Sequence, residues 1–355
     1  MSMFLCAITV CALGAEPALQ SRIDQGLPPM PTGVRVVWEV EQHAGLTRDE
    51  LGAMRRRIAG KPDHPDRPQA ESAERILTHG PDRLRREMWV DGSGRFRVCE
   101  TRASRVWEDV VVADGVVWAL SPDTLNIVDG TREPPPGRNF RPARDEAQRN
   151  LGGFVLGGLS MIIGAPKVTV QTFGRSGSEW NATAMLPDNI GEFSFRGVER
   201  GGHLLATEGR VRRLDPAPSE VGFRIVASEP WFDSPIGVVF RVVENYSPSG
   251  ALRSRHRLVE VEPWPGDRSY FAVPDRSQPR DAVRGDLNLL SVADFRDDPA
   301  GRFWRRESAD ETFEKGPPPP HDPARALVTL DRAGYLILIG AGVFVAAVWL
   351  RQRTG

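Results

Sequence analysis

Apolar and polar positions alternate along much of the chain, with the period of two that is typical of β-strands. Residues 34–41 are β-branched and partly alternating, so we expect them to form the first strand. Residues 46–59 instead place apolar side chains at helical spacing among charges, which predicts a short surface helix. Residues 60–69 are rich in Pro, Asp and His and predict a loop.

Two hairpins follow, each marked by an Asp-Gly turn between alternating apolar runs. The runs and their turns are residues 84–90 and 95–101 around Asp91-Gly92, and residues 105–113 and 116–120 around Asp114-Gly115. Asp-Gly is a strong hairpin signal because both turn residues accept a positive φ. These runs therefore predict an antiparallel meander, which with the first strand extends over about residues 34–129.

Further strand-like runs follow a loop-like stretch at residues 121–144. They are residues 167–173, 179–186, 192–197, 203–214, 222–227, 237–245, 252–261 and 270–273. Residues 287–295 are apolar-periodic within a charged, mixed segment. Roughly ten strands with few helices predict a mainly β fold, in which an antiparallel sheet curls into a half-barrel or a barrel.

Residues 151–165, between the two groups of strands, form an uncharged, Gly-rich apolar segment. Its glycines disfavour a stable helix in water. We expect this segment to pack against the sheet, and three interpretations stay open: ordinary core, a lid that contacts a ligand, or a second membrane contact.

Both ends of the chain are apolar. Residues 1–15 form a short run that ends in small residues, which is typical of a signal peptide, although it contains no Lys or Arg. Residues 333–350 carry no charge, and as a helix of about 18 residues they would span about 27 Å, close to the hydrocarbon thickness of a bilayer. Arg351 and Arg353 follow at once, and positive charge stays cytoplasmic. The body is therefore predicted to be extracytoplasmic.

These segments divide the chain into five predicted parts. They are a signal peptide at residues 1–15, a β-rich body at 16–314, a Pro-rich stalk at 315–332, a transmembrane helix at 333–350 and a cytoplasmic tail at 351–355. The body contains the hairpin meander at about 34–129, the apolar segment at 151–165 and further strands at 167–273. The stalk is expected to be an extended polyproline spacer. We expect a protein held in a bacterial cell membrane by one C-terminal span, with its body on the periplasmic side.

Charge is almost balanced, with 46 Lys and Arg against 47 Asp and Glu. A nucleic-acid binder usually carries a basic excess, so the balance argues against one. The two hairpins nevertheless alternate arginine with apolar residues, which predicts a basic outer face. The arginines are Arg83, Arg85, Arg86, Arg95, Arg97, Arg102 and Arg105. Such a face is either a solvated sheet surface or a surface for anionic lipid headgroups or envelope polymers.

The chain contains no HExxH, GxSxG, CxxC or P-loop motif. Among the six histidines, His64 has nearby aspartates but no fourth ligand for a metal. Cys99 is the one cysteine outside the predicted signal peptide, so it has no partner for an internal disulfide and is expected to be a small core residue. We predict a non-enzyme without metal or cofactor.

The hairpins also carry a family resemblance. Residues 88–92 read Met-Trp-Val-Asp-Gly, residues 112–115 read Val-Ala-Asp-Gly, and residues 117–122 read Val-Trp-Ala-Leu-Ser-Pro. Over about residues 34–129 this pattern resembles the bacterial lipoprotein-carrier family of the LolA and LolB type. The resemblance implies a half-open antiparallel barrel, covered by helices, whose apolar cavity holds acyl chains. The chain is longer than that family and adds the C-terminal apolar segment.

Two functions stay open. The first is a membrane-anchored binding protein that holds lipid or acyl chains in an apolar cavity. The residues expected to line that cavity are Trp89, Trp107, Trp118, Phe154, Leu156 and Ile162. The second is a scaffold component of a cell-envelope complex, with envelope proteins as partners and no small-molecule ligand. A continuous apolar cavity would favour the first function, and a solid core the second.

Overall fold

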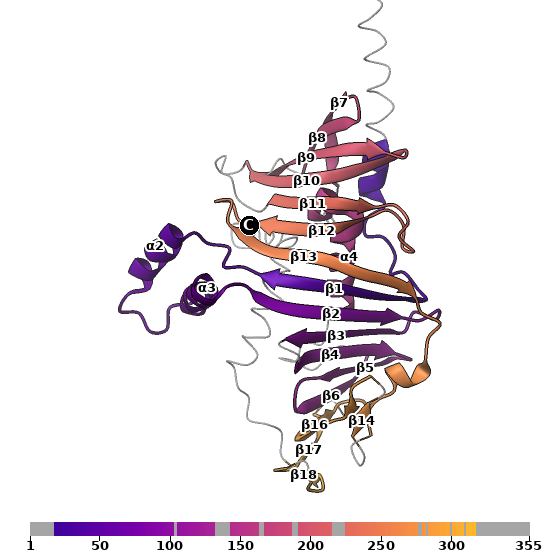
Figure 1. Ribbon diagram of the computed structural model, residues 1–355. Coiled ribbons are helices and arrows are strands. Elements are labelled where there is room, and N and C mark those ends of the chain that lie inside the picture. Colours follow the sequence, from indigo (N-terminus) through magenta and orange to yellow (C-terminus); the bar gives the residue numbers. More distant parts are fainter. Residues whose placement is uncertain are drawn as a thin grey trace, which may run out of the picture.

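The computed structural model describes residues 18–102, 105–131, 143–162, 167–186, 191–214, 224–275, 279–281, 283–298, 300–308 and 310–316. Most of these residues belong to one 16-stranded sheet, and a two-stranded ribbon lies beside it (Figure 1). The strand order is β18-β17-β16-β6-β5-β4-β3-β2-β1-β13-β12-β11-β10-β9-β8-β7. The sheet is curled and open, with β18 and β7 as its edges in the described part of the chain. The prediction of a mainly β fold is confirmed in this open form.

The elements follow the predicted order over most of the chain. The strands are β1 (Val34–Gln42), β2 (Asp82–Val90), β3 (Phe96–Arg102), β4 (Arg105–Ala113), β5 (Val116–Leu120), β6 (Thr124–Asp129), β7 (Thr169–Ser176), β8 (Glu179–Met185), β9 (Gly191–Arg200), β10 (His203–Arg213), β11 (Arg224–Trp231), β12 (Val239–Tyr246), β13 (Leu252–Pro263), β14 (Arg280–Asp281), β15 (Gly285–Asp286), β16 (Ser291–Asp294), β17 (Arg302–Arg305) and β18 (Glu314–Lys315). The helices are residues 18–24, α2 (Arg48–Ile58), α3 (Arg67–His79), α4 (Ala143–Leu156) and the 3₁₀ turns η1 (Gly157–Ile162) and η3 (Arg268–Phe271).

Strand β1 joins the two halves of the sheet. It pairs antiparallel with β2 on one side and with β13 on the other. The first half is the predicted hairpin meander, β1 to β6, and the second half runs from β7 to β13. Strand β16 extends the β6 edge by parallel pairing, so the sheet is antiparallel except at this junction.

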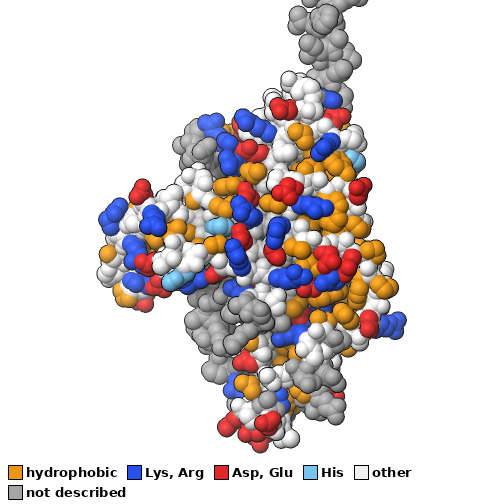
Figure 2. Space-filling model, viewed as in Figure 1, with side chains coloured by type: hydrophobic (Ala, Val, Ile, Leu, Met, Phe, Trp, Pro, Cys, Tyr) orange, Lys and Arg blue, Asp and Glu red, His pale blue; other side chains and the backbone are white. Residues whose placement is uncertain are grey.

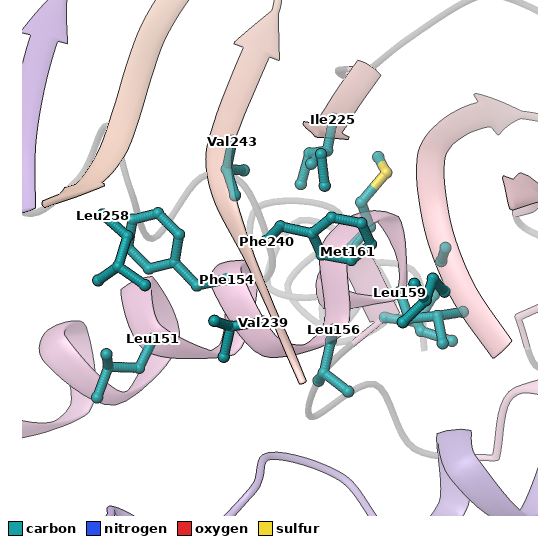
Figure 3. Packing of buried hydrophobic residues seen from close by; sticks show 14 of the residues in the cluster. Leu151, Phe154, Leu156, Leu159, Met161, Ile225, Val239, Phe240, Val243 and Leu258 are labelled. Atoms are coloured by element: carbon teal, nitrogen blue, oxygen red, sulfur yellow. The ribbon is translucent and has the colours of Figure 1, made fainter. Parts of the chain in front are cut away.

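The two faces of the sheet are covered differently. Segment α4–η1 packs against what we name the inner face, where its apolar residues join those of β1, β2, β10, β11 and β12 in one core (Figure 3). The opposite, outer face is covered near β3 to β6 by a strap, defined as residues 264–275, 279–281 and 283–290, which contributes Phe271, Leu287 and Leu289 to a second core. Because successive side chains of a strand point to opposite faces, a strand that lies under the strap presents one set of side chains to each face.

Two glycines hold η1 unusually close to the backbone of β10. A Cβ at Gly157 would lie 2.1 Å from the carbonyl oxygen of Ala206, and one at Gly158 would lie 2.5 Å from the backbone nitrogen of Gly209. Gly157 also has a φ of 53°, in the left-handed region that favours glycine. The prediction that this Gly-rich segment packs against the sheet is confirmed, and the glycines are needed for that approach.

Three local predictions are wrong. Residues 121–144 were expected to be loop but contain β6, whose alternating apolar residues lie buried against β5. Residues 270–273 were expected to be a strand, but Asp267 caps the 3₁₀ turn η3 there by accepting a bond from the Ser269 amide. The predicted loop at residues 60–69 ends early, because α3 begins at Arg67 with Pro68 in its first turn.

No helix in the described part of the chain is long and apolar enough to cross a membrane. The predicted signal peptide, transmembrane helix and cytoplasmic tail lie outside the described residues, as does most of the stalk. The topology therefore stays a prediction.

Candidate functional site

A row with three charged side chains crosses the inner face beside an apolar row. Trp38 on β1 pairs with Arg86 on β2, Arg86 with Glu100 on β3, and Glu100 with Glu108 on β4. The neighbouring row on the same face is wholly apolar. Its members are Val36, Met88, Val98 and Val110. Register thus places a polar edge directly beside an apolar floor.

A small recess, open to solvent, lies over this boundary and beneath α4. The sheet contributes both polar and apolar residues to it, and α4 contributes Ala147 and Asn150. The lining residues are Trp38, Arg86, Val98, Glu100, Glu108, Val110, Ala147 and Asn150. This combination of one apolar wall and one polar edge suits an amphiphilic ligand.

The charges of the recess are already paired. Arg86 Nε donates to Glu100 at 2.9 Å, and both side chains are largely buried. Arg102 donates to the other oxygen of Glu100. Burial opposes ionisation of Glu100, but the charges of Arg86 and Arg102 outweigh it, so the pKa of Glu100 lies below its ordinary value. Glu100 is therefore a carboxylate between two guanidinium groups.

A buried histidine lies beside this row. His256 on β13 pairs with Val40 on the inner face, and burial lowers its pKa to about 3, with a further contribution from the charge of Arg86. His256 is therefore neutral near pH 7, and its ring nitrogen Nε2 lies 3.1 Å from the Ser254 hydroxyl. It adds no positive charge to the region around the recess.

Two side chains that line the recess have buried hydrogen-bond donors without an acceptor in the described structure. They are Trp38, through its indole Nε1, and Asn150, through its amide Nδ2. Trp38 is fully buried. An unpaired buried donor costs about 1–3 kcal/mol, so native proteins seldom leave one without a reason. A bound acceptor is one such reason.

The outer face carries a second polar cluster around Arg97, which is fully buried. Its guanidinium contacts Asp109 on β4, Asp281 in the strap and the carbonyl oxygen of Tyr270. The rings of Trp89 and Trp118 lie 6.0 and 5.3 Å from its Cζ. This cluster fastens the strap to the sheet.

The five predicted cavity residues whose side chains are described lie on two different faces of the sheet. Phe154, Leu156 and Ile162 belong to the inner core, whereas Trp118 belongs to the outer core and Trp89 packs against Tyr270 of the strap. The side chain of Trp107 lies outside the described residues. The sheet itself separates the two groups, because Trp89 and Trp118 fall on the opposite side of their strands from α4.

The residues that do line the recess with polar groups were missed. Strand β2 places Leu84, Arg86, Met88 and Val90 on its inner face, so Arg86 is the one charge in an apolar series. That break in the alternation was the available signal. Asn150 gave no comparable signal, because its role depends on where α4 crosses the sheet.

Among the described residues, the predicted basic outer face does not form. Arg86 and Arg102 lie on the inner face with Glu100, and Arg97 is buried between carboxylates. Arg85 remains on the outer face but pairs with Glu87. Figure 2 likewise shows Lys and Arg interspersed with Asp and Glu on the face in view.

Cys99 is buried on β3, as predicted, and burial raises the pKa of its thiol to about 12. A thiol in that state is a poor nucleophile. Among the described residues, no group of three or more His, Cys, Asp and Glu is arranged to hold a metal ion. The prediction of a non-enzyme is not tested by these observations.

No family model matches the chain, and no curated protein matches it. Solved structures with partial similarity include a DUF1329 family protein from Desulfovibrio piger, with 9% identity, a TM-score of 0.37, and coverage of 73% of this chain and 96% of that one. An outer membrane lipoprotein-sorting protein domain from Vibrio parahaemolyticus has 6% identity and a TM-score of 0.34. The alignment covers 68% of this chain and 92% of that one. MucB has 9% identity, a TM-score of 0.24, and coverage of 79% and 67%.

At these TM-scores the alignments describe a partial resemblance and assign no ligand to this chain. A lipoprotein-sorting domain is nevertheless among the structures found. The predicted resemblance to the lipoprotein-carrier family is confirmed in this weak and partial form.

Proposed function

We propose that this protein is an extracytoplasmic binding protein that holds an acyl chain or lipid in the recess beneath α4. The observation that carries the proposal is the boundary inside the recess, where an apolar floor meets a polar edge with two unpaired donors.

Membrane attachment is part of the same proposal. The uncharged residues 333–350 with Arg351 and Arg353 behind them support one C-terminal span with the body outside. An alkaline phosphatase fusion after Pro320 should be active in a bacterial host. An inactive fusion, together with an active cytoplasmic reporter at the same position, would contradict this topology.

Native mass spectrometry of the full-length protein tests the binding function. Wild-type protein should carry a lipid-sized mass, and Ala147→Phe should lose it because the new ring fills the recess. Ala113→Phe is the matched control, since Ala113 is also buried but belongs to the outer core. Retained lipid in Ala147→Phe, or lipid lost only in Ala113→Phe, would contradict the assignment to the recess.

We propose a binding module rather than an enzyme. A panel of esters, peptides and glycans should not be hydrolysed by the purified protein. Hydrolysis that disappears on changing a single His or Asp would overturn this part of the proposal.

A scaffold role in a cell-envelope complex is the second candidate. The helical hairpin α2–α3 favours it, because its apolar residues form a small core of their own and it extends away from the sheet (Figure 1). Ligand-free wild-type protein that co-purifies with envelope proteins, and loses them when residues 46–80 are replaced by a short turn, would favour the scaffold.

A further inference from the structure

We infer that the recess recognises a neutral acyl ester or amide, through its carbonyl oxygen, in preference to a free carboxylate or a phosphate. This inference rests on the proposed function and specifies the chemical class of the ligand. The recess supplies two kinds of evidence: donors that need an acceptor, and charges that are already paired.

The donors point to a carbonyl group. The indole N–H of Trp38 can only donate, and the Asn150 amide nitrogen likewise donates. Neither has an acceptor in the described structure, although Trp38 is fully buried. A carbonyl oxygen has two lone pairs and can accept from one or both donors. An acyl ester or amide carries a carbonyl group at the end of an alkyl chain. Val98 and Val110, in the adjacent row, can pack against that chain.

The charges argue against an anion. Among its described lining residues, the recess has one guanidinium, on Arg86, and it is bonded to Glu100 at 2.9 Å. Glu108 adds a second carboxylate to the lining. An incoming carboxylate or phosphate would lose its hydration, and the one guanidinium among the described lining residues is already bonded to a carboxylate. A neutral carbonyl avoids this cost and still satisfies the donors.

Three soluble probes with the same ten-carbon chain separate these possibilities. They are monodecanoylglycerol, its ether analogue 1-O-decylglycerol, which lacks only the carbonyl, and decanoate. Affinities are measured by titration calorimetry on the full-length protein, kept in solution by a fluorinated surfactant that mixes poorly with alkyl chains. The ester should bind about tenfold tighter than the ether, and decanoate should bind more weakly than the ester.

Trp38→Phe keeps an aromatic ring but removes the donor. This variant should lose most of the ester preference, because only the Asn150 donor remains, and its ether affinity should match that of the wild type, which also reports that the recess is intact. Trp89→Phe, on the outer face, is the matched control and should keep the tenfold preference.

The outcomes separate a failure of carbonyl recognition from a failure of the proposed binding function. If none of the probes binds the wild type, the proposed function fails. If ester and ether bind equally, or if decanoate binds most tightly, the protein binds amphiphiles but carbonyl recognition is overturned. If the ester preference is undiminished in Trp38→Phe, the assignment to the Trp38 donor is overturned, and if it is undiminished in Asn150→Leu, the assignment to the Asn150 donor is overturned.

Discussion

The two faces of the sheet each bury an arginine against carboxylates, but they satisfy their polar groups differently. On the outer face, Arg97 uses its three nitrogens in five hydrogen bonds to Asp109, Asp281 and the Tyr270 carbonyl. On the inner face, the row containing Arg86 lies beside two donors without acceptors. A guanidinium has five N–H groups, so the outer cluster is complete. The outer cluster therefore fastens the strap to the sheet, whereas the inner recess keeps two donors that the proposed ligand would satisfy.

Removing the charge of Arg97 should have the largest effect. Arg97→Met leaves Asp109 and Asp281 buried without their partner, and breaking a buried pair in this way costs about 3–5 kcal/mol. The free energy of unfolding, measured by urea titration, should fall by that amount. Arg85→Met, also on the outer face but half exposed beside Glu87, should cost less than about 1 kcal/mol. If both variants lost the same free energy of unfolding, the buried Arg97 cluster would be no more important for stability than the exposed Arg85 pair.

A methyl group at the contact between η1 and β10 should have the next largest effect. Gly158→Ala places a Cβ 2.5 Å from backbone atoms of Glu208 and Gly209, so one segment must move, at a cost of about 1–3 kcal/mol. Gly52→Ala in α2 is the control, because its Cβ would meet only the flexible end of Arg56, and it should stabilise the helix by up to about 1 kcal/mol. Thermal unfolding of both variants tests whether the glycines hold the inner cover in place.

The buried histidine beside the recess should make stability depend on pH. Because the folded pKa of His256 is about 3 and the unfolded value is 6.5, the unfolded chain takes up the proton first as the pH falls. The stabilisation is complete above pH 6.5 and is lost toward pH 3, by about 2 kcal/mol at pH 5. His256→Gln should flatten this part of the stability profile, and the exposed His79→Gln should leave it unchanged. A wild-type profile identical to that of His256→Gln would contradict the assignment.

Much of the sheet could be predicted because its evidence is local. Asp-Gly turns and alternating apolar residues identified the meander, and β-branched runs identified most later strands. The turn η3 was predicted as a strand because Tyr270 and Phe271 are aromatic neighbours. Their rings instead pack against Trp264 within the strap. Local composition does not distinguish a strand from an apolar strap.

The site was harder to predict because it depends on register and on crossing elements. Trp38 pairs with Arg86 only because the hairpin α2–α3 is inserted between β1 and β2 without disturbing their pairing. The side of the sheet that Trp89 and Trp118 occupy likewise follows from register. Their apolar character suggested that they line a cavity together with Phe154, but they lie on the opposite face of the sheet. The alternation placed residues on faces, but it did not say which face α4 would cover.

Photoaffinity mapping tests most directly whether the inner recess, rather than the tryptophan-lined outer face, binds the ligand. A monoacylglycerol with a diazirine in its chain would be cross-linked to the full-length protein, and the modified peptides identified by mass spectrometry. We expect adducts on the peptides that contain Val98, Val110 and Ala147, and their loss in Ala147→Phe. Adducts concentrated on Trp89, Trp118 and Phe271 would contradict it.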